Sequence, residues 1–255
     1  MLNDRKVAVA IPAHNEERLI AGTIGTVPRF VDLVIVVDDA STDATCAEVR
    51  RAADLDGRVV VLDHSRNCGV GAAIVTAYRE ALRRGADVVA VMDGDGQMHP
   101  DDLESIVAPV CAGRADLAKG TRFDGLSPRG RMPAARWIGN VVLSAATRWA
   151  AGIDIALDAQ CGYTAVSSAA LARLPLDVLY PRYGFPNDLV LRAVEAGLRI
   201  EPVPVRAVYG AEISGIRPHI AVPRILALLA RAAVRRLAQT RQPAIRTRPL
   251  EAEEG

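Results

Sequence analysis

Short, valine-rich runs that stop abruptly at polar residues are the feature that most constrains how this chain folds. One run spans Val88 to Met92 and is followed at once by Asp93-Gly94-Asp95-Gly96-Gln97. It is too short for a helix and has no polar side, which is typical of a strand buried on both faces of a parallel sheet. Similar runs at residues 6–11, 32–37 and 58–62 alternate with helix-like segments. This alternation predicts an α/β fold with a doubly wound, mainly parallel sheet and flanking helices.

The second half of the chain continues the same predicted domain. Its expected elements are helices over 136–151 and 187–196, an edge strand over 199–208, and a last basic amphipathic helix over about 222–238. The segment 125–133 is rich in Gly, Pro and Arg and has the length of a binding segment. We therefore expect a single domain over residues 1–239, followed by a disordered tail over 240–255.

Composition narrows the classes of partner and location. The chain has 31 Lys and Arg against 30 Asp and Glu, which argues against a general nucleic-acid binder. Between Arg206 and Leu250, however, nine arginines accompany one acid, so we expect this stretch to contact an anionic surface. The four cysteines lack the paired spacing of a zinc site or disulfide framework, which indicates reduced thiols in the cytoplasm. No uncharged run reaches the roughly 18 residues of a spanning helix, so we expect a soluble or peripheral protein without a signal peptide.

The acidic turn after residue 92 is the strongest candidate for a ligand site. Asp93, Asp95 and Gln97 stand two residues apart at the carboxyl end of a predicted strand, the edge at which open α/β sheets bind ligands. Their oxygens are the kind that hard divalent cations prefer, so we expect Mg²⁺ or Mn²⁺ here. The alternative is a solvated acidic turn that binds nothing.

The loops after the other predicted strands carry further candidates for substrate binding. Those after the first two strands offer short polar side chains and main-chain groups where a nucleotide could lie, at Pro12, Ala13, Asn15, Glu16, Asp38 and Asp39. Asp38 could instead hold its own loop. Gly69 and Gly71 begin a predicted helix, where free N–H groups favour a phosphate. Close helix packing explains these glycines equally well.

Five motifs in order resemble a known family. They are Ile11-Pro12-Ala13-His14-Asn15-Glu16-Glu17, Val37-Asp38-Asp39-Ala40-Ser41-Thr42-Asp43, Asp93-Gly94-Asp95-Gly96-Gln97, Lys119-Gly120-Thr121-Arg122 and Asp158-Ala159-Gln160-Cys161-Gly162-Tyr163. The first four resemble the family 2 glycosyltransferases with a GT-A fold, over roughly residues 6–237. The fifth narrows the resemblance to the dolichol-phosphate mannose synthase-like branch, which transfers a sugar from a nucleotide sugar donor to a polyprenyl phosphate.

The resemblance implies a role for each candidate. A metal ion on Asp95 and Gln97, with Asp93 in direct or water-mediated contact, would stabilise the charge on the leaving diphosphate. Asp39 would accept a hydrogen bond from a ring N–H of the base. The remaining residues expected to bind substrate phosphates or sugar are Arg122, Arg131, Arg136 and Gln160. Asp95 and Arg122 are therefore the expected catalytic groups, together with Asp188 if a base is needed.

The sequence leaves several alternative functions open. The leading hypothesis is an inverting, metal-dependent enzyme that moves a hexose from a GDP-mannose or UDP-glucose type donor to a polyprenyl phosphate. In a soluble relative that glycosylates a sugar or small-molecule hydroxyl, Asp188 would be the base; it could also orient the acceptor or cap a helix. A binding protein that has lost transfer is a third possibility. The donor base and sugar, the polyprenol length and the oligomeric state stay open.

Two predicted helices suggest contact with a membrane. The first has Trp137 and Trp149 in one row at i, i+4 spacing, and aromatic rings favour the lipid interface. The last helix has apolar residues opposite Arg224 and Arg231, as suits a helix lying on an anionic surface. A helix packed on the sheet with solvated arginines is the alternative. We expect a peripheral protein at the inner face of the cell membrane.

Overall fold

The strand–helix alternation predicted from the sequence is present in the structure, a computed structural model that describes residues 1–123, 134–206 and 218–240. Arg131 and most of the expected tail thus lie outside the described residues. The elements are β1 (Val7–Ala13), α1 (Ile20–Gly25), β2 (Leu33–Asp38), α2 (Thr45–Leu55), β3 (Val59–Asp63), α3 (Val70–Arg83), β4 (Val88–Val91), the 3₁₀ turn η1 (Pro100–Asp102), α4 (Leu103–Cys111), β5 (Leu117–Thr121), α5 (Ala134–Ala151), β6 (Thr164–Ser167), α6 (Ser168–Leu171), η2 (Leu176–Val178), α7 (Phe185–Glu195), β7 (Ile200–Pro204) and α8 (Pro218–Thr240).

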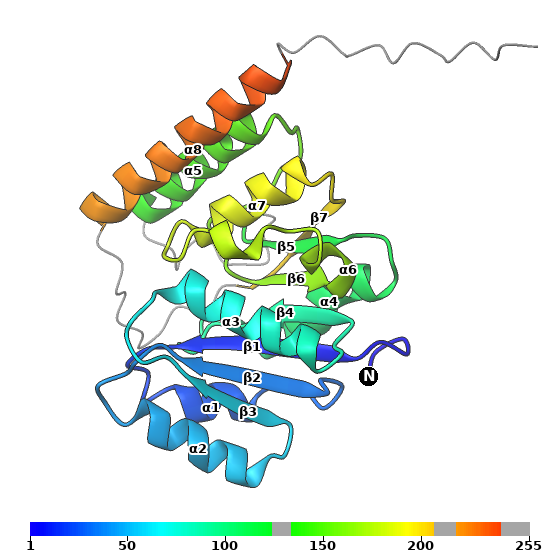
Figure 1. Cartoon of the computed structure of the whole chain (residues 1–255), viewed down its shortest axis with the longest axis vertical. Helices are drawn as coiled ribbons and strands as arrows, with labels where there is room; N and C mark the ends of the chain where they lie inside the picture. Colours follow the sequence, from blue (N-terminus) through cyan, green and yellow to red (C-terminus); the bar gives the residue numbers. More distant parts are fainter. Residues whose placement is uncertain (124–133, 207–217, 241–255) are drawn as a thin grey trace, which may run out of the picture.

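The strands of the described residues form one seven-stranded sheet in the order β3-β2-β1-β4-β6-β5-β7 (Figure 1). β3, β2, β1 and β4 are parallel to one another, β6 runs antiparallel between β4 and β5, and β7 pairs in parallel with β5. The expected doubly wound, mainly parallel sheet is confirmed. The last strand lies at the sheet edge as predicted, although it is shorter than residues 199–208.

Both faces of the sheet are buried, which explains why its strands read as continuous apolar runs. Along β1, Val7, Val9 and Ile11 belong to the core beneath α1, α2 and α4. Ala8 and Ala10 point to the opposite core, which α3, α6 and α7 cover. The small alanine side chains allow α3 to pack closely on this second face.

A further layer of two helices lies outside α7. α5 and α8 run side by side at one end of the molecule and pack against each other and against α7 (Figure 1). The apolar face predicted for the last helix is buried in this layer, at Ile225, Leu229, Ala232 and Ala233. This face therefore packs on protein and not on lipid, but on α5 and α7 and not on the sheet as the alternative raised above expects. Among the described residues, every helix falls short of the length and apolar character that crossing a bilayer requires.

The start of α3 fits tightly against the loop before α7. A Cβ atom at Gly71 would overlap the carbonyl oxygen of Tyr180 and lie 2.9 Å from Cβ of Phe185. In the same place, the N–H of Ala72 donates to the carbonyl oxygen of Pro181, at 3.1 Å. These contacts account for Gly71 by close packing, and its predicted contact with a phosphate stays a prediction.

We expect Gly71→Ala to lower the free energy of unfolding by about 1–3 kcal/mol, because the added methyl group must displace backbone. The matched control is Gly22→Ala in α1, where a Cβ would meet nothing within 4 Å. That change should be neutral or stabilising by about 0.5–1 kcal/mol. Urea unfolding of both variants measures the difference, and equal effects at the two positions would contradict the packing role.

Candidate active site

The carboxyl ends of three parallel strands bring the predicted residues to one edge of the sheet. Ala13 at the end of β1 pairs with Asp38 at the end of β2. On the other side of β1, Ala10 pairs with Val91, the last residue of β4. Asp93 follows Val91 by two residues, so the acidic turn lies beside the end of β1. β1 continues through Pro12 and Ala13, which are buried strand residues and not part of the loop that was predicted to begin there.

The acidic turn after β4 is folded compactly against β1 and α1. A Cβ at Gly94 would lie 3.1 Å from the carbonyl oxygen of Pro12, so the chain passes very close to β1 here. The hydroxyl of Thr23 donates to the carbonyl oxygen of Gly94, at 3.1 Å. The N–H of Gln97 donates to Oδ1 of Asp95, at 3.0 Å, and Gly96 between them has a φ of 73° that favours glycine.

The carboxylates at this edge crowd one another. Burial, and then the charge of Asp95, raise the pKa of Asp93 to about 7. Burial, followed by the charges of Asp95 and Asp43, raises the pKa of Glu16 to about 7 as well. Half-buried acids that repel one another are stabilised by a divalent cation that takes oxygen ligands. The donor set therefore fits Mg²⁺ or Mn²⁺, with Glu16 close to the predicted ligands.

Two cations, the buried Lys119 and the partly buried Arg122, lie near these acids. Lys119 is fully buried and its Nζ donates to the carbonyl oxygen of Cys161. Arg122 forms an ion pair with the fully buried Asp158, with 2.6 Å between Nε and Oδ2. Both cations oppose the rise in the pKa of Asp93, which places their charges in its neighbourhood. The expected catalytic residue Arg122 thus lies near the acidic turn.

The loop that contains Asp158 also touches the acidic turn directly. A Cβ at Gly162 would lie 3.0 Å from Oδ2 of Asp93 and 2.9 Å from Cε of Met98. Only a residue without a side chain leaves the present position of Asp93 undisturbed.

The loops after β1 and β2 bind each other. The N–H of Asn15 donates to the hydroxyl of Ser41, at 2.9 Å, and Oδ1 of Asn15 accepts from the N–H of Thr42, at 2.8 Å. Asp38 accepts hydrogen bonds from both the N–H and the hydroxyl of Ser41. These are the bonds expected if Asp38 holds its own loop.

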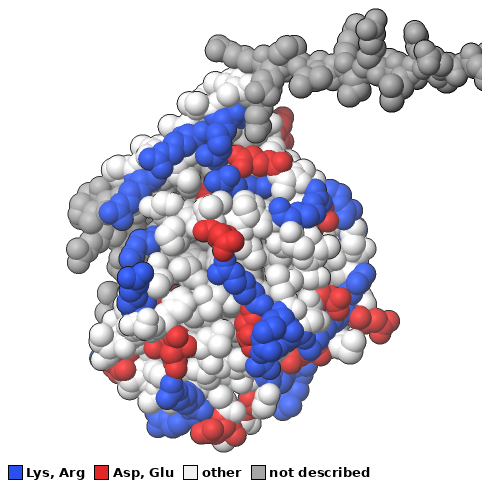
Figure 2. Space-filling model, viewed as in Figure 1, with Lys and Arg blue, Asp and Glu red and all other residues white. Residues whose placement is uncertain are grey.

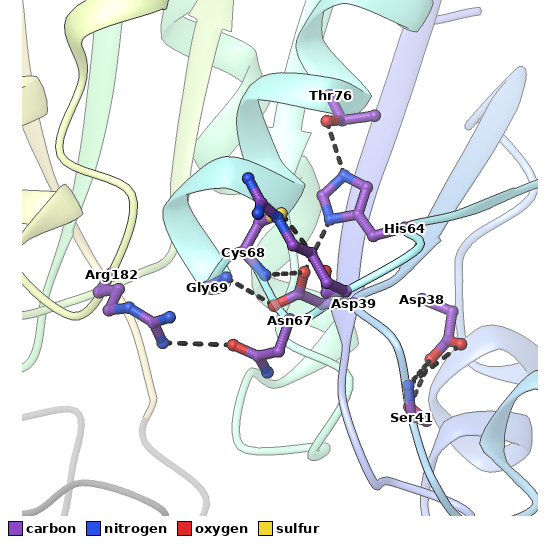
Figure 3. Close-up of polar contacts among 10 residues, drawn as sticks. Asp38, Asp39, Ser41, His64, Asn67, Cys68, Gly69, Thr76 and Arg182 are labelled. Atoms are coloured by element: carbon purple, nitrogen blue, oxygen red, sulfur yellow. Dashed lines mark hydrogen bonds and ion pairs between the residues drawn. The ribbon is translucent and has the colours of Figure 1, made fainter.

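Asp39 connects β2 to the start of α3 (Figure 3). Its Oδ1 accepts from the N–H of Cys68, at 2.8 Å, and lies 2.7 Å from Nδ1 of His64. Its Oδ2 accepts from the N–H of Gly69, at 2.7 Å. His64 is held in turn by the hydroxyl of Thr76, 2.9 Å from Nε2. The contact of Asp39 with a base stays a prediction, because a base would have to share a carboxylate that already has three protein partners.

Ligand atoms of Asp39, His64 and Cys68 also lie within 4.8 Å of one another, close enough to hold a metal ion. Hydrogen bonds within the protein already account for this arrangement. In the other such group among the described residues, at Asp38, Cys46 and Asp63, Sγ of Cys46 donates to Asp63 and Asp38 is bonded to Ser41. The acidic turn after β4 is therefore the better candidate for the catalytic metal.

Two amide side chains, of which Asn187 is fully buried, connect the Asp158 loop to two helices. Nε2 of Gln160 donates to Oδ1 of Asn187 in α7, at 3.0 Å. Nδ2 of Asn187 donates to the hydroxyl of Thr147 in α5, at 2.8 Å. Gln160 is thus bonded to protein, and its predicted contact with substrate stays a prediction.

Asp188 is almost completely buried in the first turn of α7, with 1% of its surface exposed. Its Oδ2 accepts from the N–H of Tyr180, at 2.9 Å. Burial raises its pKa, although the bond from Tyr180 opposes the rise. A residue in this setting holds the loop before α7, and reaching a substrate proton would require that loop to move.

Two predicted arginines cannot be placed, because Arg131 and the side chain of Arg136 lie outside what the structure describes. Sequence reasoning missed three neighbours of the acidic turn. Lys119 and Asp158 each begin one of the five motifs described above, and a charged residue at the start of a motif was a signal that could have identified them. Tyr183 is 44% exposed, and burial, followed by the charges of the same acids, raises its pKa. No motif marked Tyr183.

Residues 8–173 match the model of Glycosyl transferase family 2. The chain belongs to this family. Among its relatives, an undecaprenyl-phosphate mannosyltransferase of Micrococcus luteus is 33% identical over 210 residues, which are 78% of this chain and 82% of the relative. A UDP-N-acetylglucosamine–dolichyl-phosphate N-acetylglucosaminyltransferase of Methanococcus voltae is 28% identical over 81% of this chain and 87% of its own. The likeness to the polyprenyl-phosphate branch is thus confirmed, and the chain is a glycosyltransferase.

The glycosyltransferase has the GT-A fold. It aligns with the crystal structure of glucosyl-3-phosphoglycerate synthase from Mycobacterium tuberculosis bound to UDP, with a TM-score of 0.67 over 91% of this chain and 81% of that one. Identity is 23%, so this likeness concerns the fold alone. That synthase has also been crystallised with Mn²⁺ and UDP.

We expect Mn²⁺ to stabilise the glycosyltransferase more at pH 8 than at pH 6. The raised pKa values of Asp93 and Glu16 mean that both acids are largely protonated at pH 6 and ionised at pH 8. Their ionisation lowers the stability of the metal-free protein as the pH rises through 7. A cation needs the ionised forms, so its apparent affinity should rise about ten-fold per pH unit for each proton released. Thermal unfolding with and without Mn²⁺ measures this.

The control for this experiment is Asp95→Ala, which should remove the stabilisation by Mn²⁺ at both pH values. A shift in unfolding temperature that is the same at pH 6 and pH 8, or that persists in Asp95→Ala, would contradict a metal site at this turn.

Proposed function

We propose that the protein is an inverting, metal-dependent enzyme that transfers a hexose from a nucleotide sugar to a polyprenyl phosphate. The acidic turn would bind Mg²⁺ or Mn²⁺ through Asp93, Asp95 and Gln97, and the ion would stabilise charge on the leaving diphosphate. Arg122 supplies a positive charge beside this turn for a phosphate group. The names of the relatives in Micrococcus luteus and Methanococcus voltae support the lipid phosphate as acceptor. Because their sugars differ, both GDP-mannose and UDP-sugars are candidates for the donor.

The burial of Asp188 is the observation that favours a phosphate acceptor over a hydroxyl. A hydroxyl must lose its proton to a base within hydrogen-bond reach, about 2.6–3.2 Å, during the attack. Asp188 is 1% exposed and is bonded to the backbone of Tyr180, so it is poorly placed for this role. A phosphate monoester is already ionised near neutral pH and attacks without a base. The binding-protein alternative is less favoured, because the acidic turn and Arg122 are both intact.

We expect transfer to undecaprenyl phosphate that depends on Mn²⁺, falls at least about 100-fold in Asp95→Ala, and changes less than about 10-fold in Asp188→Asn. The asparagine keeps an oxygen that can accept from the N–H of Tyr180, so the change removes only a base function and the charge that pairs with Arg192, at 3.5 Å. Transfer of radiolabelled sugar is measured from UDP- and GDP-linked donors, with sugar and small-molecule alcohols as competing acceptors.

Transfer to an alcohol that collapses in Asp188→Asn would establish the soluble, base-dependent alternative. Nucleotide binding without turnover on any acceptor would instead indicate a protein that binds the donor only.

We further propose that the outer face of α5 and α8 lies on the anionic, inner face of the cell membrane. α5 has an inverted polarity for a surface helix, because Ser144 and Thr147 are buried at 3% and 0% exposure. Its large apolar residues are instead exposed, with Trp137 at 47% and Trp149 at 64%. α8 has a similar exposed row, at Val222, Leu226, Val234 and Leu237.

Arginines accompany these exposed apolar residues. The guanidinium of Arg236 in α8 lies 5.8 Å from the ring centre of Trp149 and donates to the carbonyl oxygen of Trp149, at 2.6 Å. Arg224 and Arg231 are exposed on the same helix. Figure 2 shows a band of positive charge along this side of the molecule. Apolar residues with flanking arginines suit an interface of anionic lipids.

We expect Trp137→Ala with Trp149→Ala to weaken binding to phosphatidylglycerol vesicles about 10-fold or more, because two interfacial indoles are lost. Co-sedimentation with vesicles of known composition measures the bound fraction. The matched control is Leu55→Ala, which removes an 89% exposed leucine from α2 at the other end of the molecule. Equal binding by all three proteins would contradict the proposed surface.

A further inference from the structure

The ion pair between Arg122 and Asp158 is the most deeply buried pair of opposite charges near the acidic turn. The side chain of Asp158 is 0% exposed and that of Arg122 is 17% exposed. Oδ2 of Asp158 accepts from Nε of Arg122, and its Oδ1 accepts from the N–H of Gln160, at 3.1 Å. Asp158 is out of reach of a substrate because it is wholly enclosed. Any effect it has on the reaction must pass through the groups that it touches.

The loop that presents Asp158 is fixed from three sides. The N–H of Ala159 donates to the hydroxyl of Ser144 in α5, at 3.0 Å. Gln160 is bonded to Asn187 in α7. The carbonyl oxygen of Cys161 accepts from the buried Nζ of Lys119 in β5. A carboxylate on such a rigid support has a defined position, and a guanidinium bonded to it inherits that position.

Fixing Arg122 matters because an arginine side chain is otherwise long and flexible. A free arginine side chain loses rotamer entropy when it is held in one conformation. The ion pair uses the N–H on Nε, one of the five donors of the fork. It thereby sets the plane of the fork and the direction of the terminal amino groups, which are the donors suited to bidentate contact with phosphate.

We propose that Asp158 is a positioning residue that holds Arg122 in place to bind a phosphate group of the substrates. The proposal rests on the function proposed above. The phosphate belongs either to the nucleotide donor or to the lipid acceptor, and the Michaelis constants for the two substrates distinguish these sources. Asp158 itself makes no contact with either substrate.

A double-mutant cycle tests whether Asp158 acts through Arg122. We expect Arg122→Gln to lower kcat/KM about 100-fold and Asp158→Asn to lower it about 10- to 100-fold, as for residues that orient a ligand-binding group. The double variant should be no worse than Arg122→Gln alone, since Asp158 has nothing left to position. Effects that multiply in the double variant would overturn the proposal. So would an unchanged kcat/KM per folded molecule in Asp158→Asn.

Asp158→Asn leaves Arg122, whose side chain is only 17% exposed, without its counter-charge, so this variant alone could fail to fold. The double variant removes both charges. If its kcat/KM equals that of Arg122→Gln, Asp158 acts through Arg122, and a further loss would overturn the proposal. The matched control is Asp116→Asn, which breaks the exposed ion pair of Asp116 with Arg199 at the far end of β5. It should leave kcat/KM unchanged, and a loss equal to that in Asp158→Asn would overturn the proposal.

A wild-type protein that transfers no sugar to a lipid phosphate would overturn the proposed function but not by itself the role of Asp158. In that case the wild type, the two single variants at Arg122 and Asp158 and the double variant are compared by calorimetry. The ligands are geranyl phosphate, and GDP or UDP with Mn²⁺. Asp158→Asn should weaken the same ligand that Arg122→Gln weakens. Binding of both ligands unaltered in Asp158→Asn would overturn the proposal.

Discussion

The convergence of parallel strands concentrates negative charge at one edge of the sheet, and the arrangement of this glycosyltransferase depends on how that charge is balanced. β1, β2 and β4 end beside one another, and the acids that follow them repel. Lys119 within β5 and Arg122 just after it supply the opposite charge, the first buried and the second partly buried. The antiparallel β6 separates β5 from β4. The remaining excess of negative charge is what a divalent cation would neutralise. The same acidic residues thus create the charge that the fold must balance and offer the oxygen ligands that the proposed cation needs.

The buried polar groups around the site form a second level of organisation. Asp39 joins the end of β2 to the start of α3, and the Gln160–Asn187–Thr147 chain joins the Asp158 loop to α7 and α5. Each bond links segments far apart in the sequence, and the bonds of Asp39 to Gly69 and of Asn187 to Thr147 are buried. Unpaired, such groups would cost about 1–3 kcal/mol apiece. Because these hydrogen bonds are costly to break, they hold the loops of the site in fixed positions. Fixed positions are what the orientation of reacting groups requires.

The first four strands, the edge strand β7 and the acidic turn could be predicted because each depends on local pattern. A short apolar run bounded by polar residues has few alternatives to a buried strand. The partners of single polar residues could not be predicted, since they depend on packing between distant segments. Nothing near Asp39 announces that Cys68 and Gly69 will bind it, and nothing near Asp188 indicates that Tyr180 will cover it. The apolar face of the last helix shows the same limit, because its pattern fits lipid and protein alike, and the structure buries it against α5 and α7.

The inverted polarity of α5 has a consequence for how this helix can vary. Its buried side keeps hydroxyl groups at Ser144 and Thr147, and its open side keeps indoles. Selection for a stable, freely soluble protein would preserve the first side and replace the second with charged residues. Selection for activity at a bilayer would preserve both the buried hydroxyl groups and the exposed indoles. Opposite sides of this helix are therefore under different selection. A library of variants enriched only for expression would retain the fold and lose the exposed indoles of the proposed membrane surface.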